Sequence, residues 1–426
     1  MTTDSDGAES AAKPSVAERR ALFNGEGAEV LAGALGLPPR VTSKGLSDRF
    51  AFFADAQRLA VVAGPQEEDD VELALAYAVR HAQGRSTVLV LPEGHANATS
   101  QRIPWLRSAA RPSLFVHRDG KASPRPERSQ LETVKAVIGR LGDVSPESEL
   151  TDAMMPLHLG DTSDGVWELV ERVTRDPRLD HGHRRGERSW HFAGQRLLSI
   201  RKGTEGTVVT AGIHYSGPKA PTPVVLPPGD HLSNQQVADI IQAIEQAIEE
   251  RRSGTPPIHR PDEHWLQAII RRDPSLVGVE QPALRELAAW RPRDSVNAWG
   301  RGYIDLLGLD GHGDIRIVET KLADNADDLL VLQGLDYFVW AKAYEHALRT
   351  RLGAAKNARL ELHYVLGASG KTGKIKVSHC TKPLADALDP TAVRWRFQTL
   401  HKWFQPPDDV TAVESKVSEP CEVLSE

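Results

Sequence analysis

Between about residues 23 and 145, near-continuous apolar runs alternate with helical patterns of apolar positions. The apolar runs predict strands at 58–64, 86–92 and 112–117. The periodic stretches predict helices at 69–83 and 129–141. Strands that are apolar on both faces and joined through a helix are typical of a parallel sheet covered by helices. We therefore predict an α/β domain over residues 23–145. No glycine-rich phosphate motif follows its first strand, so its role is unknown.

Residues 146–253 carry a different pattern, which predicts an α+β region. Its first predicted elements are a helix and two antiparallel strands, at 165–174, 189–199 and 206–215. Apolar side chains then recur with a helical period through 234–252, which predicts an amphipathic helix. The Ser-Gly-Thr-Pro-Pro segment at 253–257 has the composition of a linker and is the predicted domain boundary.

The next region, residues 258–404, predicts the order helix, strand, strand, strand, helix, strand, with a further strand or two. Asp262 is a suitable N-cap for the first helix, which Pro274 ends. A helical period of apolar residues runs through 326–352. Extended segments are predicted at 276–287, 303–309, 315–321, 359–366 and 374–379. We predict a mixed sheet flanked by helices.

Composition narrows the class of protein. The chain has 426 residues, 40% of them hydrophobic and 26% charged, which suits a soluble protein of two or three domains. Its two cysteines exclude a disulfide framework and a cysteine-based zinc site, and they favour a reducing, cytoplasmic compartment. No apolar run is long enough to span a membrane. Residues 1–22 are predicted to be disordered, and residues 405–426 to form a flexible tail.

Three charged residues lie on the two predicted strands within 303–321, although acidic residues are poor strand formers. Asp305 lies on the first strand. Glu319 and Lys321 lie two residues apart on the second, so both face one side of it and Thr320 faces the other. Two carboxylates can hold Mg²⁺, and a lysine can orient an attacking water or help to deprotonate it. The pattern points to metal-dependent phosphodiester cleavage.

Asp305 faces Glu319 only in one register of a hairpin, which requires an odd-numbered loop. A loop of three residues places its two flanking aspartates directly opposite each other, and such a like-charge pair is unfavourable. A five-residue loop over 310–314 keeps the register and avoids that pair. In the three-residue loop Gly313 stands where a left-handed backbone is common.

The order of elements, together with Asp305, Glu319-x-Lys321 and Gln333-x-x-x-Tyr337, resembles the PD-(D/E)XK nuclease superfamily. The stretches IDLLGLD, IVETK and QGLDY are most similar to NucS-type endonucleases, and the Gln-x-x-x-Tyr element is shared with RecB-type nucleases. The resemblance is confined to the region that begins after the predicted linker. It implies a restriction-endonuclease-like mixed sheet flanked by helices.

The resemblance also implies roles for individual residues. Mg²⁺ or Mn²⁺ would be held by the Asp305 and Glu319 carboxylates, the Thr320 carbonyl and an acid of the first helix, Glu263. Glu263 has a simpler explanation as a first-turn acid that faces the helix dipole. Lys321 would position the water. Gln333 and Tyr337 would line the site and contact the nucleic acid or support the lysine. Five arginines near the site are candidates for binding nucleic acid: Arg271, Arg272, Arg291, Arg293 and Arg301.

The implied function is that of a metal-dependent endonuclease acting on DNA, with RNA not excluded. Nucleases of this superfamily often pair to cut two strands, so a homodimer is the default expectation. The large N-terminal region suggests genome defence, as in Shedu-type proteins, or repair. The net charge of −6 leaves nucleic-acid binding to local patches, and no membrane partner is expected. The alternative is a non-cutting nucleic-acid-binding or scaffolding protein that keeps the nuclease fold.

Overall fold

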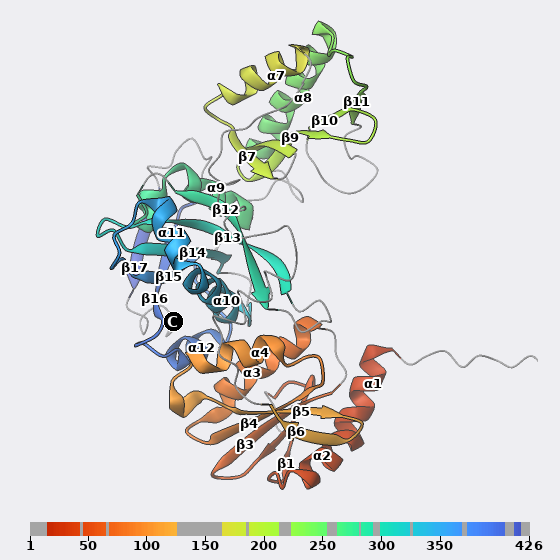
Figure 1. Cartoon of the computed structure of the whole chain (residues 1–426), viewed down its shortest axis with the longest axis vertical. Coiled ribbons are helices and arrows are strands. Elements are labelled where there is room, and N and C mark those ends of the chain that lie inside the picture. The colour runs from red at the N-terminus through yellow and green to blue at the C-terminus, as the bar shows by residue number, and fades with distance from the viewer. Residues whose placement is uncertain are drawn as a thin grey trace, which may run out of the picture. The chain divides into compact units, whose positions relative to one another are not determined.

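The computed structural model describes residues 15–42, 46–64, 68–125, 164–184, 187–212, 223–253, 262–280, 283–292, 299–323, 327–368, 373–404 and 413–418. They form three β-sheets accompanied by helices, so the protein is of mixed α/β class (Figure 1). The chain divides into two compact units. The first comprises residues 1–129, 292–300 and 383–389, and the second comprises residues 130–291, 301–382 and 390–426. Within the described ranges, no helix has the length and apolarity needed to cross a membrane.

The first unit is built on a six-stranded sheet in the order β1-β2-β3-β4-β5-β6. The strands are β1 (Arg40–Val41), β2 (Phe50–Ala54), β3 (Arg58–Ala63), β4 (Ser86–Pro92), β5 (Ser113–Arg118) and β6 (Lys121–Pro124). The central strands β3, β4 and β5 run parallel, as their apolar sequences predict, and α3 (Glu68–Ala82) contacts β3 and β4. Antiparallel pairing of β2 and β6 at the flanks makes the sheet mixed.

The helical part of the first unit starts earlier than the sequence predicts. Besides α3, its helices are α1 (Val16–Leu22), the π-helix η1 (Phe23–Gly27), α2 (Ala28–Ala34), α4 (Asn97–Arg102), η2 (Ile103–Trp105) and η3 (Ser108–Ala110). Residues 16–22 were expected to be disordered. They form α1 because the side chains of Ser15 and Glu18 each accept a hydrogen bond from the other's backbone N–H. The helix predicted at 129–141 lies outside the described residues.

The second unit contains an antiparallel sheet in the order β11-β10-β9-β8-β7. Its elements are α7 (Asp164–Thr174), β7 (Asp180–Arg184), β8 (Glu187–Phe192), β9 (Gln195–Lys202), β10 (Thr207–Ala211), β11 (Val224–Leu226) and α8 (Asn234–Ser253), which together we call the antiparallel region. Both helices occur where they were predicted. The single strand predicted at 189–199 is instead two strands, which are joined by a turn at Ala193 and Gly194 with φ angles of 47° and 74°.

The second unit also contains a mixed sheet in the order β12-β13-β14-β15-β16-β17. Its strands are β12 (Leu284–Pro292), β13 (Trp299–Leu309), β14 (Ile315–Leu322), β15 (Leu360–Gly367), β16 (Arg394–His401) and β17 (Glu414–Ser418). The helices of this stretch of chain are α9 (Glu263–Arg272), η4 (Pro274–Val277), α10 (Leu330–Ala343), α11 (Glu345–Leu352) and α12 (Thr381–Ala387). β13 and β14 are antiparallel, β14, β15 and β16 are parallel, and β17 is antiparallel. The predicted order of elements is thus present.

Several predicted elements of this region differ in the structure. The helix predicted over 326–352 breaks at Tyr344, whose φ and ψ of −112° and 20° are not helical. The segment 374–379 forms no strand. Residues 414–418, expected in a flexible tail, form β17 because their backbone completes the ladder of β16. The extended run expected at 276–287 begins instead with η4, and β12 starts only at residue 284.

One hydrophobic core joins the antiparallel region to α9 and the mixed sheet. Trp190 of β8 and Ile248 of α8 belong to the same cluster of buried side chains as Trp265 of α9 and Val318 of β14. The predicted linker lies between these regions along the chain, and its residues 254–257 are outside the described ranges. Apolar packing nevertheless makes the two regions parts of one unit.

Candidate active site

β13 and β14 pair in the register that the sequence predicts, up to the position of the charged residues. Leu306 lies opposite Val318, and one step further along the two strands come Asp305 and Glu319. There the Thr320 N–H donates to the Asp305 side chain over 2.8 Å. The Asp305 carboxylate therefore takes the place that a strand carbonyl fills elsewhere in the ladder.

The loop between these strands explains how the register is kept despite its two aspartates. Five residues join the strands, and Gly313 has the predicted left-handed backbone with a φ of 78°. The Asp310 carboxylate pairs with Arg316 over 2.9 Å, and the Asp314 carboxylate pairs with Arg359 over 2.8 Å. Each acid is paired with its own arginine, which offsets the like-charge repulsion that a three-residue loop was expected to cause.

Three hydrogen bonds fix the carboxylate of Asp305. Its Oδ2 accepts from the Thr320 N–H and from Thr320 Oγ1, which lies 2.6 Å away. Its Oδ1 accepts from Gln267 Nε2 of α9 over 2.8 Å, and the same amide lies 3.2 Å from Thr320 Oγ1. The sequence predicted that the Thr320 side chain would face away from the site. It reaches Asp305 instead, because the carboxylate turns toward the side of β14 that α9 contacts.

Lys321 links the acids of α9 and β14. Its Nζ lies 2.8 Å from Glu263 Oε1 and 3.6 Å from Glu319 Oε1. Glu263 is the first residue of α9, and the Asp262 side chain caps this helix by accepting from the Trp265 N–H. The structure thus brings the predicted residue Glu263 to the lysine, and Glu319 beside it is only 2% exposed.

The pKa values of these groups reflect a buried excess of negative charge. Burial raises the pKa of Asp305, against the opposing effect of its Thr320 hydrogen bonds and of Lys321. Burial also raises the pKa of Glu263, and the charge of Asp305 adds to this effect while Lys321 opposes it. Burial alone would lower the pKa of Lys321, but attraction to Glu319, Glu263 and Asp305 outweighs burial and raises it. The lysine is therefore protonated at neutral pH.

The predicted helix residues Gln333 and Tyr337 lie on α10, which contacts β14 and β15. Tyr337 is buried, and its hydroxyl accepts a 3.2 Å hydrogen bond from the N–H of Tyr303, two residues before Asp305. Gln333 is half-buried, and its amide makes no hydrogen bond to another described residue. Tyr337 therefore supports the strand that carries Asp305, whereas the Gln333 amide is available to a ligand.

A glycine lets α10 approach the sheet next to these residues. A Cβ on Gly334 would lie 2.5 Å from Cε1 of Tyr364, a fully buried residue of β15. Tyr364 in turn donates its hydroxyl proton to the Val331 carbonyl over 2.9 Å. Because β15 pairs with β14, with Tyr364 beside Glu319, this close contact fixes the distance between α10 and the site.

The five predicted nucleic-acid-binding arginines have different environments. Arg271 is buried and its guanidinium lies 2.6 Å from Glu286, so it supports the interior of the site. Arg272, the next residue of α9, is exposed. Arg291 and Arg301 lie on β12 and β13, but their side chains are outside the described part of the structure, as is the whole of Arg293. Of the described side chains in this set, Arg272 is the one that is exposed to solvent.

Sequence reasoning missed Gln267, which contacts Asp305 directly. The residue lies four positions after Glu263, so the two share one face of α9. It is 6% exposed, and its Oε1 is approached by His264 Nδ1 at 3.3 Å and by Arg271 Nη2 at 3.5 Å. No local pattern in the sequence marks Gln267, because the contact that gives it a role joins residues that are 38 positions apart.

The donor set can be compared with what a divalent cation requires. Three carboxylates face one lysine, which leaves excess negative charge, and Mg²⁺ prefers oxygen ligands. Asp305 uses three of its roughly four acceptor sites for hydrogen bonds. Among the residues that the structure describes, no three His, Cys, Asp or Glu side chains are arranged as a metal site. The negative charge and the oxygen ligands therefore fit such a cation. In this structure, however, protein hydrogen-bond donors occupy the Asp305 carboxylate.

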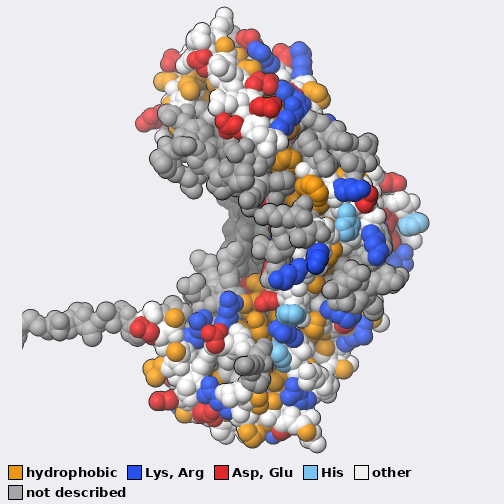
Figure 2. Space-filling view, turned by 180° about the vertical axis from the view of Figure 1, so that it is seen from behind, with side chains coloured by type: hydrophobic (Ala, Val, Ile, Leu, Met, Phe, Trp, Pro, Cys, Tyr) orange, Lys and Arg blue, Asp and Glu red, His pale blue; other side chains and the backbone are white. Residues whose placement is uncertain are grey.

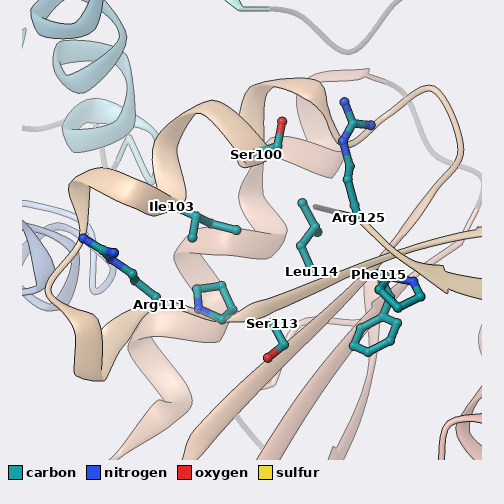
Figure 3. Close-up of a pocket in the computed structure, with 9 residues that line it drawn as sticks. Ser100, Ile103, Arg111, Ser113, Leu114, Phe115 and Arg125 are labelled. Carbon is teal, nitrogen blue, oxygen red and sulfur yellow. The ribbon is translucent and has the colours of Figure 1, made fainter. Parts of the chain in front are cut away.

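A separate cavity of about 350 Å³ occurs in the first unit (Figure 3). Ile103 and Leu114 form its centre, whereas the guanidinium groups of Arg111 and Arg125 point outward at opposite ends. Arg111 donates to the carbonyls of residues 104 and 106, each over 2.8 Å. On the face of the first unit seen in Figure 2, basic and acidic side chains are interspersed.

The chain matches no family model, no curated protein and no solved structure. The basis for a functional assignment is therefore the geometry and charge of the site itself.

Proposed function

We propose that the second unit cleaves phosphodiester bonds in DNA with the help of Mg²⁺ or Mn²⁺. The observation that carries this proposal is the meeting of Asp305, Glu319, Lys321 and Glu263 where the pairing of β13 and β14 stops. Lys321 lies within 4 Å of both glutamates, and the field of Asp305 acts on it as well. A protein that used these residues only for packing would gain nothing from placing the buried Glu319 and the partly buried Asp305 and Glu263 around one lysine.

Each residue then has a chemical task. Asp305, Glu319, the Thr320 carbonyl and Glu263 would hold the cation, which when bound supplies positive charge to the phosphate and to the departing oxygen. Lys321 is protonated, so it positions the attacking water by donating a hydrogen bond rather than by removing a proton. Gln267 and the Thr320 hydroxyl keep the Asp305 carboxylate in place. The exposed Arg272 is the described arginine that suits contact with the DNA backbone.

The order of elements supports a fold of the PD-(D/E)XK type for this region. α9 precedes the sheet, β13 and β14 form the antiparallel hairpin with the acids, and α10 and α11 are followed by the parallel strand β15 (Figure 1). By the same resemblance we propose a dimeric endonuclease used in genome defence or repair. These further assignments rest on the similarity of motifs alone.

A second candidate function is supported by a specific observation. The Asp305 carboxylate is occupied by three protein donors, and the described residues form no ready group of three metal ligands. This favours a protein that binds or organises nucleic acid without cutting it. The Asp305, Glu319 and Lys321 set is complete, however, and for that reason cleavage is the better-supported function.

Supercoiled plasmid incubated with the full chain and Mn²⁺ separates the two functions. We expect nicked or linear DNA from the wild type, and no product from Asp305→Ala or in the presence of EDTA. A gel-shift assay with the same samples reports binding. Binding without any product from the wild type, over several DNA forms including single-stranded and branched DNA, would establish the non-cutting function instead.

A further inference from the structure

Arg251 lies at the end of α8 in the antiparallel region, yet it contacts the start of the helix that carries Glu263. Its side chain is fully buried. Its Nη2 donates to the Ala193 carbonyl over 2.9 Å and to Asp262 Oδ1 over 3.0 Å. Its guanidinium also lies over the Trp265 ring, 4.8 Å from the centroid. The planar guanidinium of a buried arginine has a fixed geometry, so it holds the Ala193 carbonyl, the Asp262 carboxylate and the Trp265 ring in place relative to one another.

The turn between β8 and β9 presses on the same end of α9. Ala193 and Gly194 both have positive φ, as a two-residue hairpin turn requires. A Cβ on Gly194 would lie 2.1 Å from the His264 carbonyl oxygen, so the turn contacts the α9 backbone directly. Only glycine permits this approach. The first turn of α9 is thus fixed from the antiparallel region by backbone contact as well as by Arg251.

The C-terminal end of α9 is also linked to the antiparallel region, through Arg285. Arg285 of β12 donates to the Arg271 carbonyl over 2.9 Å, and its guanidinium lies 3.4 Å from Asp180 of β7. Both ends of the helix that presents Glu263 and Gln267 are therefore tied to elements of the antiparallel region.

We propose that Arg251 is a positioning residue of the candidate active site, which fixes α9 so that Glu263 meets Lys321 and Gln267 meets Asp305. This inference rests on the proposed function, and it assigns the antiparallel region a role in that site. The path is short, since Asp262 and Glu263 are adjacent and Gln267 follows one helical turn later. A shift of α9 by 1 Å would remove hydrogen bonds that measure 2.8 Å.

The test compares Arg251→Met with Arg178→Met in the full chain. Arg178 is a suitable control because it bridges Asp176 and Glu245, so its ion pairs lie within the antiparallel region and not on α9. Hydrogen–deuterium exchange is followed for peptides from α9 and from α10. We expect Arg251→Met to speed exchange in α9 at least tenfold with little change in α10, and Arg178→Met to leave both at the wild-type rate. Wild-type exchange of α9 in folded Arg251→Met would overturn the proposal.

Cleavage kinetics supply the functional readout. For Arg251→Met we expect the kcat to fall by about 10- to 100-fold while KM for DNA stays near the wild-type value, as for groups that orient metal ligands. An unchanged kcat would overturn the positioning role. If the wild type cuts no DNA, the proposed function fails, whereas the exchange data still decide whether Arg251 fixes α9.

A second variant covers the case in which Arg251→Met does not fold. Asp262→Asn keeps a good N-cap for α9 but removes the charge that Arg251 contacts. Asp262 is half-exposed, so the substitution leaves no buried cavity. We expect faster exchange in the first turn of α9 and a smaller fall in kcat than for Arg251→Met. Wild-type values of both would count against the proposal.

Discussion

Thr320 Oγ1 donates a 2.6 Å hydrogen bond to Asp305 Oδ2, so the residue between Glu319 and Lys321 orients the acid of the neighbouring strand. The same Oδ2 accepts from the Thr320 N–H. One residue of β14 therefore contributes two of the three donors that hold Asp305. The acid-x-lysine pattern contains in its middle position a group that organises the site.

Thr320→Val tests this relationship with little change of shape. Loss of the hydroxyl removes one donor to Asp305, and we expect a roughly 10-fold lower cleavage rate at saturating DNA, as is usual for groups that orient metal ligands. Initial rates on plasmid DNA with Mn²⁺ measure it. Thr87→Val, at a buried strand position of the first unit, serves as the control and should cut at the wild-type rate. Equal rates for both variants would show that the hydroxyl is dispensable.

Asp305→Asn should abolish cleavage and yet stabilise the protein at neutral pH. The pKa of Asp305 is raised in the folded state, chiefly by burial, so the folded state binds a proton more readily than the unfolded state. Stability of the wild type therefore falls as pH rises from the ordinary pKa of an aspartate through the raised value. Asparagine has no charge to bury, and the Gln267 amide can turn over to pair with it.

The pH dependence of thermal unfolding checks this prediction. We expect the Tm of Asp305→Asn to exceed that of the wild type at pH 7 and the difference to vanish in acid, where Asp305 is protonated in both states. A variant that is less stable than the wild type at pH 7 would show that the ionised carboxylate is net stabilising. Asp314→Asn is the contrasting control, because its Arg359 hydrogen bonds lower the pKa of Asp314 despite the opposing effect of burial.

Lys321→Met should destabilise the second unit by about 3 kcal/mol, because Glu319 would remain buried without the lysine's charge. Adding Glu319→Gln to the same chain removes that uncompensated charge, and the double variant should recover most of the loss. Urea unfolding followed by tryptophan fluorescence gives the free energies. A double variant no more stable than Lys321→Met alone would mean that the lysine stabilises through packing rather than through charge.

His191 should make the second unit acid-sensitive. Burial lowers the pKa of His191 to about 4, with Glu286 opposing and Arg271 adding to the effect, so the folded state binds fewer protons than the unfolded state between about pH 4 and 6.5. Stability therefore rises with pH across that window and is lost on acidification, by at most about 1.4 kcal/mol per pH unit. His191→Gln keeps a partner for Ser189 and should flatten the dependence of Tm on pH between 4 and 6.5. An unchanged slope would assign the acid sensitivity to other groups.

Gly334→Ala should destabilise the protein, although Gly→Ala in a helix interior ordinarily adds about 1 kcal/mol of stability. The new Cβ would lie 2.5 Å from the buried Tyr364 ring, and overpacking of this kind costs about 1–3 kcal/mol. The clash is therefore expected to outweigh the gain in propensity. Gly33→Ala in α2 is the matched control, because no atom lies within 4 Å of its added Cβ and the residue is exposed. Thermal unfolding should move in opposite directions for the two variants.

Elements with a strong local signal could be predicted from the sequence. The parallel strands β3, β4 and β5 are apolar throughout, α8 has a regular helical period, and the register of β13 and β14 follows from loop length and side-chain alternation. Glu263 of α9 was named through the resemblance, which implies an acid on the first helix of the region. These features depend on short stretches of chain, where the pattern of apolar and polar residues is sufficient.

Other features depend on partners that are distant in sequence. Gln267 carries no signal until Asp305 is known to lie 2.8 Å from its amide. The turn at Ala193 was missed because alanine seldom adopts a positive φ, and the packing of the turn on α9 enforces it here. β17 was taken for tail because its charged residues resemble a solvated segment, and only the open edge of β16 makes it a strand.

The first unit is assembled from separated pieces of the chain. Trp105 and Arg107 exchange backbone hydrogen bonds with Asp389 and Ala387, and the Arg107 side chain donates to the Leu388 carbonyl. A fragment that stops before residue 383 would lack the segment 383–389, so Trp105 and Arg107 would lose these partners. A fragment that starts at the predicted linker would contain 383–389 without the rest of the first unit. Because each unit is made of several separated segments, a truncation at any single position would interrupt at least one of the two units. Gene fusions should therefore keep the full chain.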